Sequence, residues 1–441
     1  MTAQSAQSDQ SRTSRPTKAA RRHPRRRGFT FAAIALFATA TAFTGGCASN
    51  KPALQATSDR TYACWPPFPQ EPRVVYLRSF SSTLDLEQQK TKLDEIMYGK
   101  DPQQESMIQH PYGLDMYKGL IYVCDTKSGI VIIDLHKKQM RLMGVGGAVQ
   151  VTKPVDIAIA PDGRKYVADS QRESVYVFDA NDVFQAQIGH AGLKPVSVAV
   201  HDNELFVSDF KSNRIEVFDR NTGKSLRFIG GPGQEKGKLV DPIGVDVDKE
   251  GNVYVDDIVN CRIQKFTPDG KKVTLSIGAL GDRPGTFTRP KHLAVDQEGI
   301  IYVVDAAFQN VQMFNQQGKG LLFFGSAGTH PGSMDMPAGI CVHDGDLDLF
   351  ASDIPPAFDA QRLVLVTNQF GDDRVSVYAL GHLKAGHSVN ELAGSKGLVP
   401  VGTSSEPTQG PGFPLDVAQP THSGAATTMP AAAAPSPAVT P

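Results

Sequence analysis

Residues 242–266 have the sequence PIGVDVDKEGNVYVDDIVNCRIQKF. The segment opens with a proline and an apolar run, turns at Gly251-Asn252, continues through Tyr254-Val255-Asp256-Asp257 and closes at Phe266. Its β-branched and aromatic residues follow a period of two, and Gly, Asn and Asp separate the apolar runs. Such a segment is typical of short antiparallel strands joined by tight turns.

This pattern recurs along the chain. The phrase Tyr-Val-x-Asp, once with Phe in place of Tyr, ends at aspartates spaced 44, 40, 48 and 48 residues apart, namely Asp125, Asp169, Asp209, Asp257 and Asp305. A proline precedes each aspartate by 14 or 15 residues, at Pro111, Pro154, Pro195, Pro242 and Pro290. Each unit predicts a four-stranded sheet, which cannot bury both faces alone. Stacked radially, such units form a β-propeller.

A sixth unit begins at Pro337 and is irregular. Asp353 stands at the expected spacing, but Asn368 stands ten residues before Tyr378, which closes a clear strand. We therefore assign the motif position to Asn368 and treat residues 354–361 as an insertion.

The last unit lacks a clear outer strand, whereas residues 73–80 form a predicted strand without a blade. Pairing that strand with the last blade would close the ring and remove a free sheet edge. The sequence therefore predicts an all-β fold, a six-bladed β-propeller of four-stranded antiparallel blades over residues 72–390, closed by an N-terminal strand.

The N-terminal residues 1–46 have the organisation of an export signal. Basic residues cluster at Arg25 to Arg27, and an uncharged run follows from Phe29 to Phe43. This run has the length of a signal-peptide core and is short for a membrane span. Small residues before Cys47 resemble a bacterial lipobox, which predicts a lipid on the Cys47 sulfur. An ordinary cleaved signal peptide is the alternative, and either the general secretory or the twin-arginine route fits.

Two further segments flank the repeats. Residues 47–71 are rich in Pro and predict a tether, and residues 391–441 are rich in Pro, Ala and Thr. The second segment cannot bury enough apolar area to offset its ordering entropy, so we expect it to be disordered.

The charge distribution argues against nucleic acid as a partner. Residues 1–46 hold eight Lys/Arg and one acidic residue, so the remaining chain has 37 basic and 45 acidic residues, a net charge of about −8. A negative surface repels the phosphate backbone.

The repeat resembles the NHL repeat over about residues 109–380. Asn213-Arg214-Ile215-Glu216-Val217-Phe218 and the equivalent residues 260–266 carry this resemblance best. More narrowly, Trp65-Pro66-Pro67-Phe68-Pro69, the strand after it and Val366-Thr367-Asn368-Gln369 are similar to a group of bacterial NHL lipoproteins. The resemblance implies a six-bladed propeller on the periplasmic or outer side of the cell envelope, often beside multihaem cytochrome systems, and implies no reaction. The complete repeat framework, the tether and the export signal together suggest a non-catalytic scaffold that binds an envelope protein and is held at the membrane by a lipid on Cys47.

The sequence does not present a catalytic constellation, and we predict no catalytic residue, cofactor or bound metal. NHL propellers include a peptide-amidating lyase that holds zinc with three histidines, but only His110 and His292 lie near strand openings here. Two histidines at different offsets cannot supply a three-ligand open zinc site. A metal-dependent lyase or lactonase, or a sensor for a small ligand, remains the alternative to a binding scaffold.

Two sets of residues are candidates for binding. Residues at blade openings should gather at one mouth of the ring because the units are equivalent, and they are His110, Lys153, Lys194, Asp241, Arg289 and His292. They form either a docking surface or ordinary solvated loops. Asp115, Asp156 and Asp246 lie on predicted innermost strands and could face a channel cation, as in calcium-binding lactonase propellers. The Tyr-Val-x-Asp aspartates, by contrast, are expected to accept backbone N–H bonds in turns.

Overall fold

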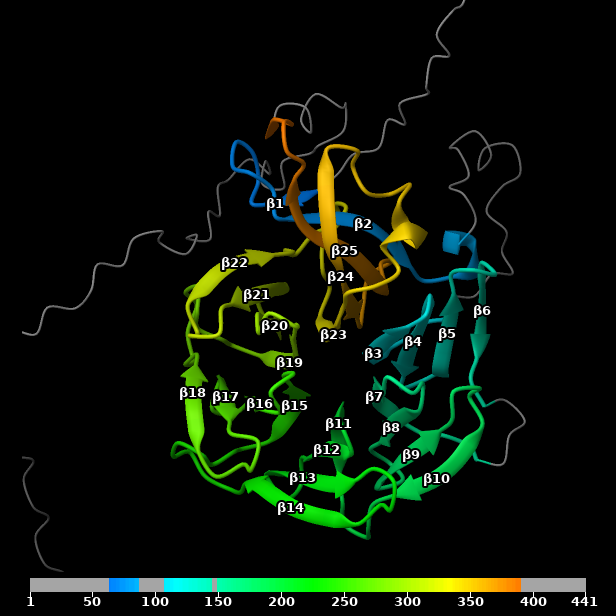
Figure 1. The fold of residues 1–441 in the computed structure, drawn as a ribbon, viewed down its shortest axis with the longest axis vertical. Helices are drawn as coiled ribbons and strands as arrows, with labels where there is room; N and C mark the ends of the chain where they lie inside the picture. The colour runs from blue at the N-terminus through cyan, green and yellow to red at the C-terminus, as the bar shows by residue number, and fades with distance from the viewer. Residues whose placement is uncertain (1–62, 87–106, 145–148, 390–441) are drawn as a thin grey trace, which may run out of the picture. The chain divides into compact units, whose positions relative to one another are not determined.

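The computed structural model describes residues 63–86, 107–144 and 149–389, which all lie within one unit, Thr57–Pro441. These residues form six antiparallel blades around a central axis, as the sequence predicts (Figure 1). The predicted signal peptide 1–46, Cys47 and the tail 391–441 lie outside the described residues. None of the helices in the described ranges is long and apolar enough to cross a membrane.

Five blades have four strands each and follow one another in the chain. The first contains β3 (Pro111–Tyr117), β4 (Leu120–Asp125), β5 (Gly129–Asp134) and β6 (Gln139–Leu142), and the second contains β7 (Pro154–Ile159), β8 (Lys165–Asp169), β9 (Ser174–Phe178) and β10 (Phe184–Ile188). The third contains β11 (Pro195–His201), β12 (Glu204–Asp209), β13 (Arg214–Asp219) and β14 (Ser225–Gly230). The fourth contains β15 (Pro242–Val247), β16 (Val253–Asp257), β17 (Arg262–Phe266) and β18 (Val273–Ile277), and the fifth contains β19 (Pro290–Val295), β20 (Ile301–Asp305), β21 (Asn310–Phe314) and β22 (Gly320–Phe324).

The sixth blade combines both ends of the described chain. Its strands are β23 (Pro337–His343), β24 (Phe358–Asn368), β25 (Val375–Leu383), β2 (Val74–Phe80) and β1 (Cys64–Trp65). In Figure 1 the blue β2 lies beside the orange β25, and the two pair antiparallel with Val75 opposite Ala379 and Phe80 opposite Val375. The predicted closure by residues 73–80 is therefore confirmed. Two short 3₁₀ helices, η1 (Thr83–Leu86) and η2 (Leu347–Phe350), complete the described elements.

The predicted tether 47–71 needs a correction at its C-terminal end. Cys64 and Trp65 form β1 and are almost fully buried. The Trp65 ring packs against Phe324 and Tyr378, with ring centroids 6.2 and 5.8 Å apart. A single large aromatic ring buries enough apolar area to order this short segment, so the fold begins before residue 72.

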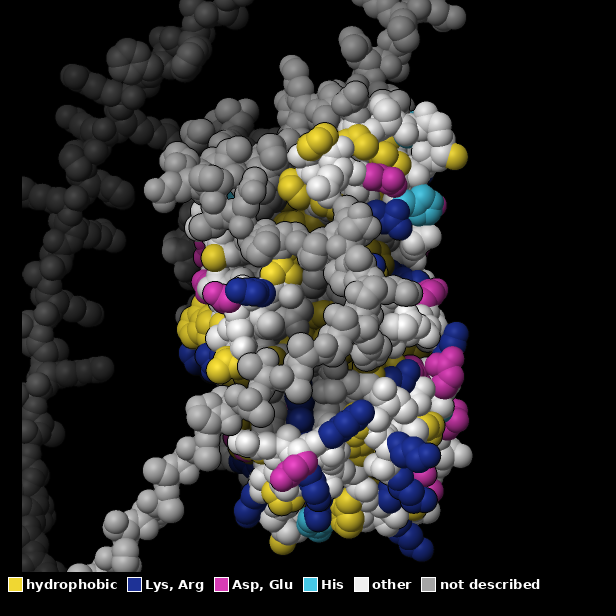
Figure 2. Space-filling view, turned by 90° about the vertical axis from the view of Figure 1, so that its left-hand side faces the viewer, with side chains coloured by type: hydrophobic (Ala, Val, Ile, Leu, Met, Phe, Trp, Pro, Cys, Tyr) yellow, Lys and Arg dark blue, Asp and Glu magenta, His cyan; other side chains and the backbone are white. Residues whose placement is uncertain are grey.

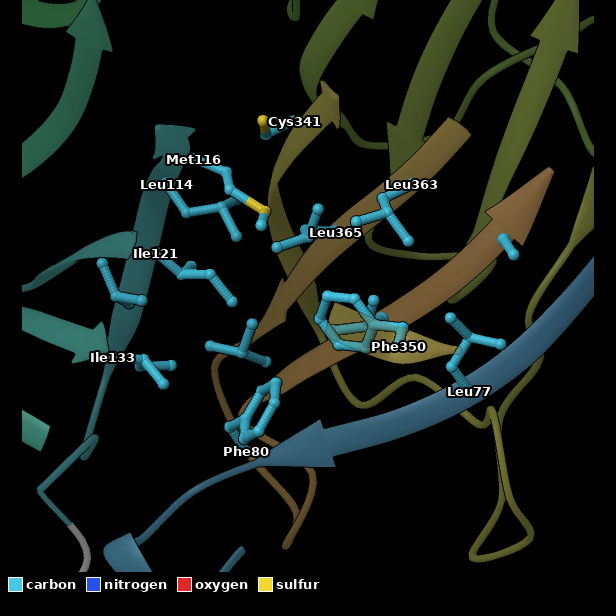
Figure 3. Packing of buried hydrophobic residues seen from close by; sticks show 14 of the residues in the cluster. Leu77, Phe80, Leu114, Met116, Ile121, Ile133, Cys341, Phe350, Leu363 and Leu365 are labelled. Carbon is cyan, nitrogen blue, oxygen red and sulfur yellow. The ribbon is translucent and has the colours of Figure 1, made fainter. Parts of the chain in front are cut away.

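A large apolar cluster joins the sixth blade to the first (Figure 3). Leu77 and Phe80 from β2 lie with Leu363 and Leu365 from β24 and with Leu114 from β3. The closing strand thus contributes to the packing between blades as well as to the sheet, and burial of such side chains stabilises the fold by about 1.5–3 kcal/mol each.

In three of the blades the motif aspartate connects two loops. The Asp125 carboxylate accepts N–H bonds from Gln109 and His110, before β3, and from Lys127 and Ser128, after β4, at 2.6–2.8 Å. Asp169 and Asp305 each accept four equivalent bonds. The structural interpretation of these aspartates is confirmed for these three blades.

In the sixth blade Asn368 ends β24, and its Oδ1 atom accepts the N–H of Asp335 at 3.3 Å. Asn368 therefore takes the motif position, as expected from its distance to Tyr378. Asp353 lies instead in the segment between η2 and β24. The insertion extends β24 to eleven residues.

We expect Asp169→Ala to lower the free energy of unfolding by about 2–4 kcal/mol, because four backbone N–H groups lose their acceptor in a buried position. Urea denaturation followed by circular dichroism measures this change. Asp282→Ala, at an exposed position, is the matched control and should change the free energy by less than about 0.5 kcal/mol. Equal effects of the two substitutions would contradict the role given to the motif aspartates.

Candidate functional site

The six innermost strands bring their openings to one mouth of the channel. These strands contact one another in a closed series, from β3 to β7, β11, β15, β19, β23 and back to β3. Each begins with a proline and runs in the same direction relative to its blade. Residues before each proline therefore surround the same mouth, and these are the predicted His110, Lys153, Lys194, Asp241 and Arg289.

The mouth residues differ in what they contact. Lys153 and Arg289 are exposed, and the Lys194 ammonium donates to the Ser170 carbonyl. Asp241 has a positive φ of 53°, and its N–H donates to the Asn213 side chain. The His110 Nδ1 atom lies 3.2 Å from Thr126 Oγ1, and burial lowers the pKa of His110 below its ordinary value, assisted by Lys127, Lys291 and Arg374.

A cluster on the fifth, sixth and first blades includes the predicted His110 and four residues that were not predicted from the sequence. We call His110, Tyr112, Lys291, Gln369 and Phe370 the mouth cluster. The Lys291 ammonium donates to Gln369 Oε1 at 2.6 Å and lies 5.2 Å from the centre of the Tyr112 ring. The Phe370 side chain is 49% exposed, and its ring meets the His110 ring edge to face at 5.6 Å.

One sequence signal could have located Lys291. It directly follows the opening proline of its blade, where the other five blades have Tyr112, Val155, Val196, Ile243 and Ala338. A basic residue at a position that is otherwise apolar is an exception to the repeat. Burial, together with the nearby Arg289, lowers the pKa of Lys291 to about 8.

His292 lies below the mouth, inside the channel, rather than on the mouth itself. Its Nε2 atom is 3.2 Å from Asp156 Oδ2 and 3.4 Å from Ser197 Oγ. All three residues stand two positions after an opening proline, where the first, fourth and sixth blades have glycine. The structure thus brings together one residue predicted for the mouth, one predicted for the channel and a serine that was not predicted.

This trio is not arranged for nucleophilic catalysis. The Ser197 hydroxyl donates to Asp156 Oδ2 at 2.7 Å, and the same histidine nitrogen faces both partners. A catalytic relay needs the serine proton directed to one ring nitrogen and the carboxylate at the other. Burial by itself lowers the pKa of His292, but the carboxylates of Asp156, Asp246 and Asp256 together raise it above the ordinary value.

Asp115 and Asp246 lie two residues further along their strands than Asp156 does. Each accepts its neighbour's N–H and one N–H from the next blade, from Ile159 and Val295 respectively, at 2.7–2.8 Å. Burial raises the pKa of Asp115 to about 6 and that of Asp246 to about 7. Within the described ranges, no three His, Cys, Asp or Glu residues are placed to hold one metal ion. The predicted channel aspartates connect neighbouring blades through backbone N–H groups.

Asp256 on β16 is buried, and among the residues that the structure describes neither of its carboxyl oxygens has a hydrogen-bond partner. Burial raises its pKa well above the ordinary value, an effect to which Asp257 and Asp305 add and which His292 opposes. Ser208 and Thr367 occupy the equivalent position in their blades and donate their hydroxyls to the carbonyls of Pro242 and Tyr112.

A separate groove of about 530 Å³ lies on the outer side of the third and fourth blades. It is lined by Phe228 and Phe266 together with Lys236, Lys271 and Lys272. Figure 2, which views the molecule from this side of the ring, shows Lys and Arg side chains gathered toward its lower end. The groove is an open surface feature, remote from the channel residues.

Comparison with known proteins gives structural matches only. No family model matches the chain, and no curated protein matches it. A protein of unknown function from Bacteroides thetaiotaomicron is 16% identical, covering 70% of this chain and 75% of its own, with a TM-score of 0.48. A gluconolactonase from Xanthomonas campestris is 12% identical, covering 72% and 97%, with a TM-score of 0.46. The virginiamycin B lyase from Staphylococcus aureus is 12% identical, covering 62% and 95%, with a TM-score of 0.43.

We expect Asp256→Asn to become increasingly stabilising as pH rises. The folded state retains the Asp256 proton above the ordinary pKa of the unfolded chain, so wild-type stability falls with rising pH, while asparagine does not titrate. The melting temperature of the variant should match that of the wild type near pH 4 and exceed it by a few degrees at pH 8. Asp282→Asn is the control at an exposed site and should show no such trend. A difference between Asp256→Asn and wild type that is constant over this pH range would contradict the interpretation.

Proposed function

We propose that this chain is an exported, lipid-anchored β-propeller of the NHL type that binds protein partners in the cell envelope without catalysing a reaction. The mouth cluster carries the proposal. It presents an exposed phenylalanine, a histidine ring and a lysine on a rigid scaffold at the end of the channel. Exposed aromatic side chains beside a basic one are typical of protein-binding surfaces.

Two other features support a binding role over an enzymatic one. The Asp156–Ser197–His292 trio directs its serine proton to a carboxylate, which leaves the hydroxyl unactivated. The carboxylates of Asp115 and Asp246 each accept a backbone N–H bond from the neighbouring blade, and these bonds hold the two blades together. These four channel residues, Asp156, Ser197, Asp115 and Asp246, thus make hydrogen bonds that stabilise the ring.

The site of action follows from the N-terminal sequence pattern. An export signal before Cys47 would place the propeller outside the cytoplasmic membrane, with the lipid on that cysteine as its anchor. A protein held there can meet partners that are embedded in or bound to the same membrane, including the cytochrome systems that accompany similar lipoproteins.

Capture of the tagged protein from envelope extracts of cells that express it tests the binding role. We expect quantitative mass spectrometry to find a partner that is enriched with the wild type and reduced about tenfold with the double variant His110→Ala, Phe370→Ala. Phe228→Ala, at an exposed phenylalanine on the outer groove, is the control and should retain the partner. A partner set that the mouth variant leaves unchanged would overturn the proposal.

The anchor is tested separately. We expect Cys47→Ser to abolish incorporation of labelled fatty acid and to move the protein from the membrane fraction to the soluble envelope fraction, because the sulfur is the point of attachment. Cys64→Ser, at a buried cysteine within β1, is the control and should retain the label. Unchanged labelling of Cys47→Ser would contradict lipid attachment at this residue.

A further inference from the structure

The ammonium group of Lys291 has no acidic partner in the part of the chain that the structure describes. Its one hydrogen bond to another side chain is to the neutral amide of Gln369, at 2.6 Å. The lysine is only partly exposed, so water does not fully replace the missing counter-ion. A partly desolvated cation without an anion is costly, and nearby anions bind it strongly for that reason.

The surroundings add to this excess of positive charge. Arg289 is exposed two residues before Lys291, and Lys127 and Arg374 are near enough to lower the pKa of His110 together with Lys291. The Asp125 carboxylate accepts the His110 N–H, but four backbone N–H groups already occupy it. The basic side chains of Lys127, Lys291 and Arg374 thus lie near His110, while the Asp335 carboxylate lies beside Gly371, the residue after Phe370.

The ammonium is held in position before any ligand arrives. The Gln369 side chain accepts its hydrogen bond, and the backbone carbonyl of Gln369 accepts a bond from the Arg374 guanidinium at 2.6 Å. The Tyr112 ring lies beneath the ammonium, at a distance typical of a cation–π contact. A fixed lysine loses little side-chain entropy on binding, which favours affinity.

The rim beside the lysine is aromatic. The exposed Phe370 ring and the His110 ring meet edge to face, so an apolar side chain could lie on them while a neighbouring carboxylate reaches Lys291. A peptide with an acidic side chain next to an apolar one could make both contacts at once. A small free carboxylate would use the lysine but leave the aromatic rim empty.

We propose that Lys291 binds a carboxylate from an acidic, partly apolar segment of a partner protein, which lies over Phe370 and His110 at the channel mouth. This inference rests on the proposed binding function and names the chemistry of the partner.

The test uses a fluorescein-labelled ten-residue peptide of alternating glutamate and phenylalanine with both ends capped, titrated with the whole folded protein. We expect saturable binding by fluorescence anisotropy, and none with the matched peptide in which glutamine replaces glutamate. Lys291→Met should weaken binding about tenfold or more, and Lys291→Arg should retain most of it. Lys272→Met, at a lysine of the outer groove, should change binding less than twofold.

Phe370→Ala provides a second variant at an exposed position, where folding is not at risk, and should weaken binding severalfold. Three results would overturn the inference: no binding of the acidic peptide up to 1 mM, equal binding of the glutamine peptide, or binding that Lys291→Met does not change. Displacement of the peptide by succinate at equal affinity would also overturn it, because the site would then belong to small carboxylates. If the envelope partner depends on the mouth but the acidic peptide fails, the binding function stands and only this inference is lost.

Discussion

The hydrogen bonds of the motif aspartates are the constraint on which the ring depends. In three blades, as Asp125 and Asp305 show, this carboxylate binds N–H groups of the loop before an innermost strand and of the turn after the second strand. Asp257 instead reaches its turn through the Asn260 side chain, and Asp209 accepts the Lys194 N–H of the preceding loop. Without this acceptor, several backbone donors would be buried unpaired, at a cost of about 1–3 kcal/mol each. The bonds also determine where each innermost strand starts, and hence where the channel mouth lies.

Exceptions to the repeat create the polar features of the channel. At the position after the opening proline only the fifth blade has a lysine, and one residue later three blades have Asp156, Ser197 and His292 while three have glycine. The glycines let neighbouring strands come close, since a Cβ atom at Gly339 would lie 2.3 Å from the Tyr112 carbonyl oxygen. The positions that hold the blades together thus follow the repeat. The polar side chains of the channel stand at positions where single blades differ from it.

Stability and binding make opposite demands at this end of the molecule. Among the described residues, Lys291 has no acidic partner and the Asp256 carboxyl group has no hydrogen-bond partner. Replacing either of these groups by a neutral one of similar shape would make the protein more stable. Proteins retain such groups most often at functional sites. The outer apolar clusters, by contrast, contain the ordinary aliphatic and aromatic side chains of a packed interface between blades.

The number of blades, the motif aspartates and the assignment of Asn368 could be predicted from the sequence alone, because they follow from a period of forty-odd residues. The closing strand could be predicted because the last blade had a free edge that needed a partner. The sequence also placed His110 and its equivalents at one mouth. Only the tertiary structure brought His292 to Asp156 and Lys291 to Gln369, residues on different blades and up to 136 positions apart. Such contacts depend on side-chain directions across the ring, and a repeat pattern contains no information about them. The burial of Trp65 likewise depended on rings from two other strands, so no local signal could separate it from a tether.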